Sequence, residues 1–193
     1  MNDITFSLWH SSFGWIGLAA NARGMVAITS PRALRRLALA GLRELIGPGG
    51  TTGENEFIRA ARAELERYFR QDPRGDLRRV QLDLQRGTPL QRQYWQLLRE
   101  IPYGETRTYH ELARALGRPR AARAVGQCNA RNPWAIVVPC HRVIGENASL
   151  TGYAGGLEMK RRLLELEGIQ VTALRAMKLA AARQWRRRDA LRN

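Results

Sequence analysis

The strongest candidate for chemistry is Cys140, which follows Pro139 and precedes His141 and Arg142. A thiolate is a good nucleophile, and nearby positive charge lowers the pKa of a thiol. His141 could accept the thiol proton, and Arg142 could supply a positive field. Neighbouring side chains on an extended chain point in opposite directions, so a bridging water or a local helical turn would have to connect Cys140 with His141. The alternative is a small buried cysteine without chemistry.

The other cysteine is Cys128, whose setting among Ala and Gly predicts a small core or interface residue. The sequence contains no Cys-x-x-Cys pair, and the three histidines, His10, His110 and His141, are scattered. This pattern predicts no structural zinc site.

Residues 87–169 hold the elements that must position Cys140. The expected elements are a helix from Thr88-Pro89 to about Glu100, a helix over about 107–116, a helix over about 120–130, a buried strand over 135–138 that Pro139 breaks, a flexible loop over 150–156 and a helix over 157–167. The thiol would then lie at a strand end. The second and third helices, joined by a short turn that contains Gly117, have the form of a helix-turn-helix.

Residues 1–86 are expected to form a separate, small α+β domain. Alternating and apolar stretches predict strands over 4–9, 13–20, 24–29 and 80–84, and helical spacing predicts helices over 31–46 and 54–71. No cluster of residues in this half suggests chemistry.

The helix expected over 120–130 is unusual, because charged and very small residues alternate along it: Arg120, Ala121, Ala122, Arg123, Ala124 and Gly126. A helix with its side chains is about 10–12 Å across, whereas the minor groove is about 6 Å wide. A helix reduced to Ala and Gly could approach a widened minor groove, and a protruding arginine could enter the base stack. The plainer alternative is that Ala is simply the best helix former.

The chain is strongly basic, with 32 Lys and Arg against 17 Asp and Glu, a net charge of +15. This charge predicts a nucleic-acid partner, although a solubilising surface is the alternative. The tail over 170–193 carries seven Lys or Arg and one acid, and we hypothesise that it adds phosphate contacts. No apolar run approaches the roughly 18 residues of a membrane span, and the N-terminus does not resemble a secretory signal, so we expect a cytoplasmic protein.

Together, residues Gly87 to Gly168 resemble the O6-alkylguanine-DNA alkyltransferase family. The matching motifs are Thr88-Pro89 with Trp95, Ile101-Pro102-Tyr103-Gly104-Glu105-Thr106, Tyr109, Ala121-Ala122-Arg123-Ala124-Val125-Gly126, Asn132-Pro133, Pro139-Cys140-His141-Arg142-Val143, the loop from Leu150 to Leu157, and Leu163-Leu164-Glu165-Leu166-Glu167-Gly168. The Pro-Cys-His-Arg-Val motif is the most specific of them. The N-terminal half matches only in length and layout.

The resemblance implies an α+β protein with a ribonuclease H-like N-terminal domain and a C-terminal winged helix-turn-helix. It implies irreversible, single-turnover transfer of an alkyl group to Cys140 from O6-alkylguanine, and from O4-alkylthymine, in duplex DNA. The helix pair would enter the minor groove, and the damaged nucleotide would be flipped into a pocket beside the cysteine. No cofactor or catalytic metal is needed. A monomer is expected, and cooperative binding along DNA is left open.

The resemblance also implies a role for each matching residue. Cys140 is the acceptor, and His141 and Glu167 draw off its proton through a water. Asn132 ties the helix pair to the active-site strand. Tyr109 turns the phosphate and faces the base. Arg123 fills the vacated space in the stack, within a DNA-binding surface made of Arg120, Ala121, Ala122, Arg123, Ala124, Gly126 and Tyr109. The pocket residues are Ala135, Pro139, Val143, Tyr153, Ala154, Gly155, Gly156 and Lys160.

Two departures from the family pattern limit these expectations. With no cysteine before Cys128, the chain should lack the zinc site that some members carry in the N-terminal domain. Ala135 and Ala154 stand where other members have Pro, Ser or Arg, which leaves open which alkyl groups fit.

Three rival functions are weighed against alkyl transfer. A non-catalytic alkyltransferase-like protein would bind the lesion, but such proteins lack the acceptor cysteine. A helix-turn-helix regulator is disfavoured by the Arg123 finger and the Ala-rich helix. A cysteine hydrolase is disfavoured because no oxyanion-hole or triad spacing is present.

Overall fold

The computed structural model describes residues 3–170. The N-terminal half is built on a sheet of four strands: β1 (Thr5–Ser11), β2 (Gly14–Asn21), β3 (Gly24–Ile28) and β4 (Thr51–Thr52). Their order is β3-β2-β1-β4, with β1, β2 and β3 antiparallel and β4 parallel to β1. The three N-terminal strands and the turn after Asn21 confirm the sequence prediction. The two-residue strand β4 is too short to leave a periodic signal.

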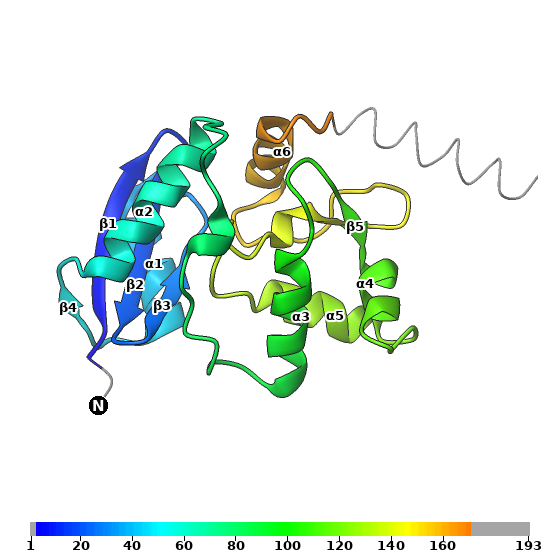
Figure 1. Cartoon of the computed structure of the whole chain (residues 1–193), viewed down its shortest axis with the longest axis horizontal. Coiled ribbons are helices and arrows are strands. Elements are labelled where there is room, and N and C mark those ends of the chain that lie inside the picture. Colours follow the sequence, from blue (N-terminus) through cyan, green and yellow to red (C-terminus); the bar gives the residue numbers. More distant parts are fainter. Residues whose placement is uncertain (1–2, 171–193) are drawn as a thin grey trace, which may run out of the picture.

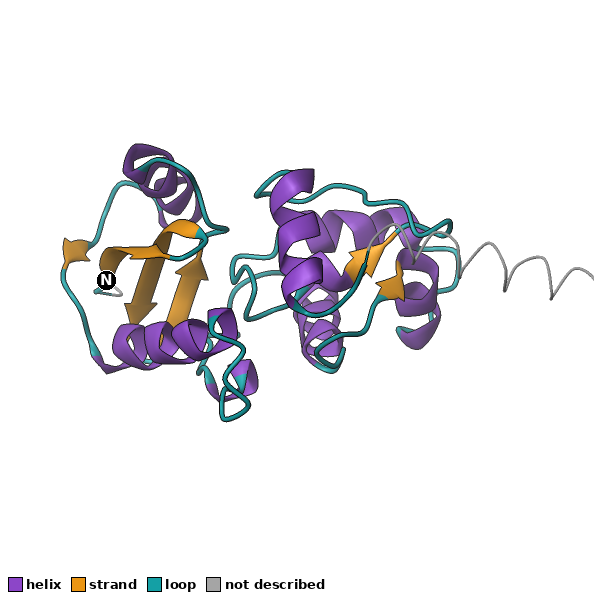
Figure 2. Ribbon diagram, turned by 90° about the horizontal axis from the view of Figure 1, so that it is seen from above, coloured by secondary structure: helices purple, strands orange, loops and turns teal. Residues whose placement is uncertain are grey.

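Two helices, α1 (Arg35–Ile46) and α2 (Glu56–Phe69), cover opposite faces of this sheet (Figure 2). Successive strand residues point to opposite faces. On β2, Leu18 packs in the same cluster as Ile58 of α2, whereas Ala19 packs with Leu42 of α1. The sheet therefore has two buried faces, and the face under α2 belongs to the larger core.

Two predictions in this half were wrong in detail. Helix α1 begins at Arg35 rather than at Pro31, because the backbone of Arg32 pairs with that of Trp15 in both directions, at 2.7 and 2.8 Å. Residues 80–84 form no strand. Leu82 makes only an isolated bridge to Met25, after a 3-10 helix, η1 (Leu77–Arg79).

The C-terminal half consists mainly of helices (Figure 1). Its elements are α3 (Pro89–Arg99), β5 (Arg107–Thr108), α4 (Tyr109–Ala115), α5 (Ala122–Ala130), a 3-10 turn η2 (Cys140–Arg142), β6 (Val143–Ile144) and α6 (Leu157–Leu166). Strands β5 and β6 pair in parallel. The connector between α4 and α5 spans residues 116–121, longer than predicted, because Gly117 turns at φ +69° and Arg118 N–H still donates to Ala113 O at 2.9 Å.

The predicted strand over 135–138 is absent, and a compact turn replaces it. Val138 N–H donates to Trp134 O at 2.9 Å, and Ile136 has a positive φ of +73°. Just before this turn, Pro133 O accepts from Ile28 N–H at 2.7 Å and Ala135 N–H donates to Ile28 O at 2.9 Å. Cys140 therefore starts a 3-10 turn, and the segment that leads to it is hydrogen-bonded to strand β3.

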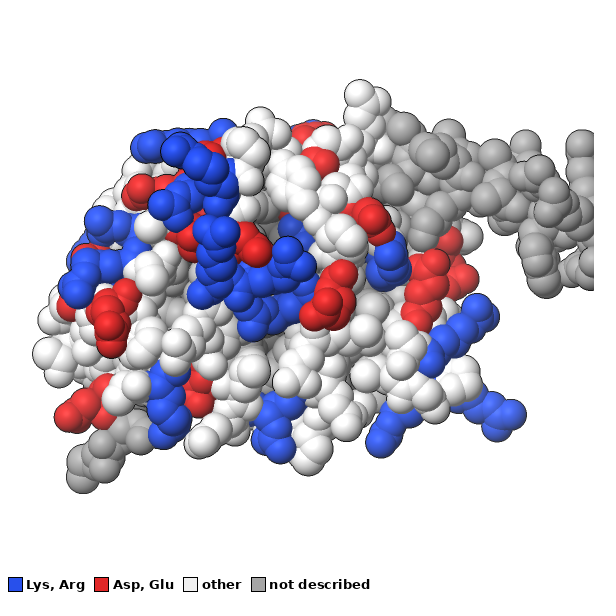
Figure 3. Space-filling model, viewed as in Figure 1, with Lys and Arg blue, Asp and Glu red and all other residues white. Residues whose placement is uncertain are grey.

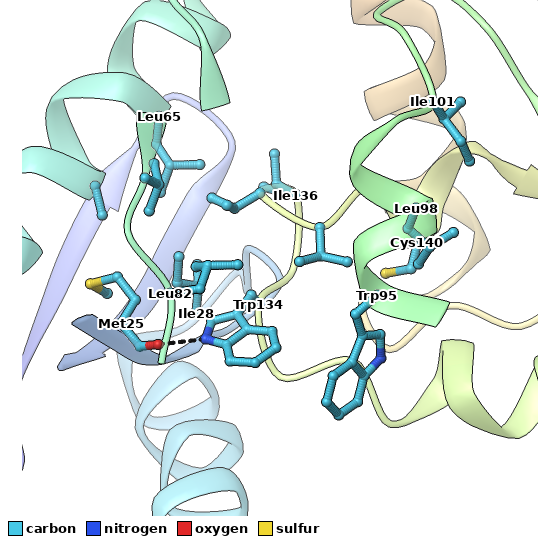
Figure 4. Close-up of a cluster of buried hydrophobic side chains, with 14 of the residues drawn as sticks. Met25, Ile28, Leu65, Leu82, Trp95, Leu98, Ile101, Trp134, Ile136 and Cys140 are labelled. Atoms are coloured by element: carbon cyan, nitrogen blue, oxygen red, sulfur yellow. Dashed lines mark hydrogen bonds between the residues drawn. The ribbon is translucent and has the colours of Figure 1, made fainter. Parts of the chain in front are cut away.

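The two halves share one apolar core (Figure 4). Trp134 lies between them, fully buried, with its indole N–H donating to Met25 O at 2.7 Å. Its ring meets that of Trp95 edge to face, with centroids 5.3 Å apart. The N-terminal half thus fixes the chain segment that carries the candidate nucleophile.

No helix among residues 3–170 is long and apolar enough to cross a membrane. The hypothesis about the basic tail concerns residues 171–193, which lie outside the described part of the chain.

Candidate active site

Cys140 is 6% exposed, and its Sγ lies 3.1 Å from Nδ2 of Asn132. The same Nδ2 donates to Val138 O at 2.8 Å, while Asn132 Oδ1 accepts from Trp134 N–H at 3.0 Å. Asn132, which follows α5, therefore contacts both the turn over 134–138 and the Cys140 thiol. Burial raises the pKa of the thiol, against the Asn132 hydrogen bond and the nearby charge of Lys160, which favour the thiolate.

Next to the thiol, His141 is fully buried and hydrogen-bonded to Glu167 at the end of α6. Its Nε2 lies 2.8 Å from Glu167 Oε1, and its Nδ1 is buried with no hydrogen-bond partner among the described residues. Neutral imidazole carries one N–H, and a carboxylate only accepts, so the proton sits on Nε2 and Nδ1 is a free acceptor. Burial lowers the pKa of His141, although Glu167 opposes this effect.

Arg142 does not supply the positive field that the sequence suggested for the thiol. Its Nε donates to Glu167 Oε2 and its Nη2 to Oε1, both at 2.9 Å, and its Nη1 donates to Ile101 O at 2.6 Å. Burial alone would raise the pKa of Glu167, but His141 and Arg142 outweigh it and hold that pKa at about 2. Glu167 is therefore a buried carboxylate that stays ionised at neutral pH.

Lys160 of α6 is the second buried cation. Its Nζ donates to Val143 O at 2.5 Å and to Thr151 O at 2.7 Å, and burial lowers its pKa to about 8. It joins strand β6 to the loop over 150–156 and places a charge near Cys140. Lys160 and Val143, both predicted pocket residues, are thus brought together.

Replacing Lys160 with methionine is expected to raise the pKa of the Cys140 thiol further, because burial of the thiol then acts without an opposing charge. The folded protein is treated with a thiol reagent at a series of pH values. The rate at which Cys140 is alkylated is then read from the mass of the peptide that contains it. Arg161→Met on the same helix is the control, since Arg161 pairs with Glu158 and Glu165 at the surface. An unchanged profile for Lys160→Met would show that the ammonium does not act on the thiol.

The glycine-rich loop packs against the end of strand β3. A Cβ at Gly155 would lie 2.7 Å from Cε1 of Tyr153 and 3.0 Å from Cβ of Ser30. The Tyr153 ring lies 6.5 Å from that of His141, edge to face. The hydroxyls of Tyr153 and Ser30 are both buried. Tyr153 and Gly155 are therefore at the site, and Ser30 joins them from the N-terminal half.

Other predicted pocket residues are less closely tied to the thiol. Ala154 and Gly156 are exposed on the loop, and Gly156 precedes α6 with a φ of +88°. Ala135 and Pro139 are buried in the segment before Cys140, where Ala135 pairs with β3. The described contacts of Pro139 and Gly156 with the site are backbone hydrogen bonds: Pro139 O accepts from Arg142 N–H at 2.9 Å, and Gly156 O accepts from Lys160 N–H at 3.1 Å.

The predicted DNA-binding residues lie on and around α5. Arg123 and Arg120 are exposed, and no described side chain forms an ion pair with either. Ala121, Ala122, Ala124 and Gly126 are partly exposed. Tyr109, which starts α4, lies 3.8 Å from the position of a Cβ on Gly126, and its hydroxyl accepts from Thr151 Oγ1 at 3.3 Å. Tyr109 thus connects the helix pair to the glycine-rich loop.

Tyr68, which lies in the helix predicted over 54–71, was not among the predicted site residues. Its hydroxyl donates to Glu167 Oε1 at 2.7 Å and lies 3.4 Å from His141 Nε2. Tyr68 is separated from Glu167 by 99 positions along the chain, so no local pattern could have revealed this contact.

A cavity of about 730 Å³ lies at the junction of the two halves, near the Lys and Arg side chains that gather over η1 in Figure 3, and Tyr68, Pro139 and Arg142 form part of its lining. Arg74, Arg78, Arg79 and Arg99 line it, but Asp72 pairs with Arg74 and Asp76 with Arg78. Cys140 and His141 do not line this cavity. Among the described residues, no group of three or more His, Cys, Asp or Glu is placed to hold a metal ion.

Comparison with known proteins gives consistent results. Residues 89–169 match a family model described as 6-O-methylguanine DNA methyltransferase, DNA binding domain. A methylated-DNA–protein-cysteine methyltransferase of Methanosarcina acetivorans is 43% identical over 84% of this chain and 97% of its own length. One from Mycobacterium bovis is 61% identical over 46% of this chain and 53% of its own.

Solved structures agree with these matches. A crystal structure of Mycobacterium tuberculosis OGT in complex with DNA superimposes with a TM-score of 0.70 at 39% identity, covering 84% of this chain and 92% of that one. The mixed α+β fold, with its small N-terminal sheet and helical C-terminal half, is therefore shared with a protein crystallised on DNA.

Proposed function

Because this chain belongs to the family of methylated-DNA–protein-cysteine methyltransferases, we propose that Cys140 is the residue that accepts the alkyl group from O6-alkylguanine in duplex DNA. The function is direct-reversal DNA repair, in which the base is restored without cutting the strand. The observation that carries the assignment is the buried Cys140 thiol beside His141, whose Nδ1 is a free acceptor and whose Nε2 is held by Glu167.

In the proposed reaction, the thiol proton passes through a water molecule to Nδ1 of His141, and Glu167 stabilises the resulting imidazolium. Sγ then forms a bond to the alkyl carbon while the bond from that carbon to O6 breaks. The guanine takes up one proton as it leaves, so that the thiol proton is replaced by the alkyl group. The product is a thioether, which no described group is placed to cleave, so each molecule reacts once. O4-alkylthymine presents the same alkyl–oxygen bond and is a second proposed substrate.

The same proposal assigns the C-terminal half to DNA. Residues 87–169 would form the catalytic domain with a winged helix-turn-helix, and the family match over 89–169 supports this division from residues 1–86. The exposed, small-residue surface of α5 fits a minor groove, with Arg123 in the space of the flipped base and Tyr109 beside it. The chain would act as a monomer. Two free cysteines fit a reducing cytoplasm.

A stoichiometric titration tests this function. Limiting protein is mixed with a duplex carrying one O6-methylguanine, and repaired DNA is counted after the reaction stops. The expected result is one repaired lesion for each protein molecule, none for Cys140→Ala, and the full amount for Cys128→Ala, the matched control. Repair of many lesions per molecule would exclude self-alkylation, and tight lesion binding without repair would indicate a lesion-sensing protein instead.

Arg123→Ala is expected to slow alkyl transfer on duplex DNA by on the order of 10-fold, because the space that the flipped base leaves in the base stack then stays empty. The deficit should shrink on a single-stranded substrate, where no stack needs filling. Arg36→Ala, an equal change of charge at an exposed position of α1, is the control. Equal deficits on duplex and single strand would argue against the finger role and for a plain phosphate contact. Single-turnover kinetics on the two substrates make the comparison.

A further inference from the structure

The N-terminal half contributes one hydroxyl to the buried network behind the nucleophile. Tyr68, on α2, is 6% exposed, and its Oη lies 2.7 Å from Glu167 Oε1. The neighbouring Tyr103 also reaches the end of α6, but its hydroxyl donates to the backbone of Leu166 at 2.7 Å, and Tyr103 is 49% exposed. Of these two tyrosines, Tyr68 is the one that contacts the Glu167 carboxylate.

The carboxylate of Glu167 has five hydrogen-bond donors around it. Oε1 accepts from Tyr68, from Nε2 of His141 at 2.8 Å and from Arg142 Nη2 at 2.9 Å. Oε2 accepts from Arg142 Nε at 2.9 Å and from Gly104 N–H at 3.3 Å. A carboxylate offers about four lone-pair sites, so five donors compete for them. Each donor therefore reduces the negative charge that the others experience.

The groups that face His141 come from several elements. Glu167 favours its protonation, while Arg142 of η2 and Lys160 of α6 oppose it, as does burial. Tyr153 of the loop presents a neutral ring edge. Tyr68 stays protonated, because burial and the adjacent carboxylate raise its pKa well above the usual range. It is therefore a permanent donor to Oε1, and it comes from the N-terminal half of the protein.

We propose that Tyr68 is a positioning residue for alkyl transfer: by sharing Oε1 of Glu167 with His141, it keeps the imidazole neutral, with its proton on Nε2 and Nδ1 free to accept. The inference rests on the proposed function. Without the hydroxyl, Glu167 draws His141 toward the imidazolium form at neutral pH, and the acceptor for the thiol proton is lost. The N-terminal half then takes part in the reaction, beyond supporting the fold.

The test compares Tyr68→Phe with Tyr103→Phe in the full-length chain, by single-turnover transfer rates from about pH 6 to about pH 9. Tyr68→Phe is expected to be slowed most at the acid end, by a factor that approaches but does not exceed about 10 if the pKa of His141 rises by about one, and to approach the wild-type rate at the alkaline end. Tyr103→Phe should follow the wild type throughout. A Tyr68→Phe profile equal to the wild type, or lowered by the same factor at every pH, would overturn the proposal.

A second measurement needs no variant. Nitrogen-15 NMR of the wild-type protein is expected to show His141 neutral at neutral pH, with its proton on Nε2. A proton on Nδ1, or a charged ring, would refute the inference even if Tyr68→Phe failed to fold. If the wild type transfers no alkyl group at any pH, the proposed function fails, and the NMR result still reports separately on the network.

Discussion

Replacing Glu167 with glutamine is expected to slow alkyl transfer by at least about 100-fold and to lower the free energy of unfolding by about 3–5 kcal/mol at neutral pH. The carboxylate is fully buried and compensates the buried guanidinium of Arg142. Glutamine keeps the shape but leaves that charge unpaired, and it cannot stabilise an imidazolium on His141. Single-turnover kinetics and urea unfolding measure the two effects.

The stability effect of Glu167 should depend on pH in a defined direction. The pKa of Glu167 is held at about 2 in the folded chain, against an ordinary value of 4.5. A group with a lowered folded pKa stabilises the protein above its unfolded pKa and loses that contribution as the pH falls through its folded pKa. The difference corresponds to about 3 kcal/mol, lost between about pH 5 and pH 2.

The control for Glu167→Gln is Glu165→Gln, two residues earlier, in the last turn of α6. Glu165 is exposed and pairs with Arg161 at 2.6 Å on the surface. Exposed pairs contribute about 0–1 kcal/mol, so this variant should unfold and react nearly as the wild type does. If both variants behaved alike, or if the Glu167→Gln deficit persisted unchanged at about pH 2, the account of a buried ionised carboxylate would be wrong.

Trp134→Ala is expected to cost about 3–5 kcal/mol of stability and to slow transfer as well. The side chain is fully buried between the two halves, and its indole N–H satisfies the Met25 carbonyl (Figure 4). Its backbone N–H donates to Asn132, whose Nδ2 touches the Cys140 thiol. A cavity at this position should therefore weaken the packing between the two halves and allow the Asn132 side chain to move away from the Cys140 thiol. Thermal unfolding and transfer kinetics provide the readouts.

Trp134→Phe separates the two contributions of this side chain. Phenylalanine keeps most of the apolar contact with Trp95 and removes one of two donors to the Met25 carbonyl, since Asp83 N–H still donates to it at 2.9 Å; the loss should cost about 0.5–1.5 kcal/mol. Transfer should then be slowed less than in Trp134→Ala. A Trp134→Ala variant as stable as the wild type would mean that the two halves do not depend on this contact.

The sequence was sufficient to predict what short patterns encode. Alternating and apolar stretches predicted strands β1 to β3, and Thr88-Pro89 predicted the start of α3, where Thr88 and Gln91 form a capping box. The Pro-Cys-His-Arg-Val motif predicted Cys140 and His141 as site residues, and the resemblance to the family added Glu167; the structure brings His141 and Glu167 into hydrogen-bond contact. The role of Cys140 as the nucleophile stays a prediction. The predictions of β1 to β3 and of the start of α3 were confirmed because they depend on local propensity.

Features that depend on tertiary contacts were not predictable in this way. The apolar run over 135–138 has strand composition, yet its backbone turns, because the N–H of Ala135 and the carbonyl of Pro133 pair with Ile28 of β3. Arg142 was assigned a field on the thiol, but its partner, Glu167, lies 25 positions away. Tyr68 gave no signal, since a tyrosine on an apolar helix face normally belongs to the core.

The measurement that tests the central claim most directly is the intact mass of the protein after reaction with a duplex carrying one O6-methylguanine, followed by peptide mapping. The account predicts a gain of one methylene group on the wild type, located on Cys140, and no gain on Cys140→Ala. A methyl group on Cys128, or an unmodified wild-type protein beside repaired DNA, would contradict the assignment of Cys140 as the acceptor.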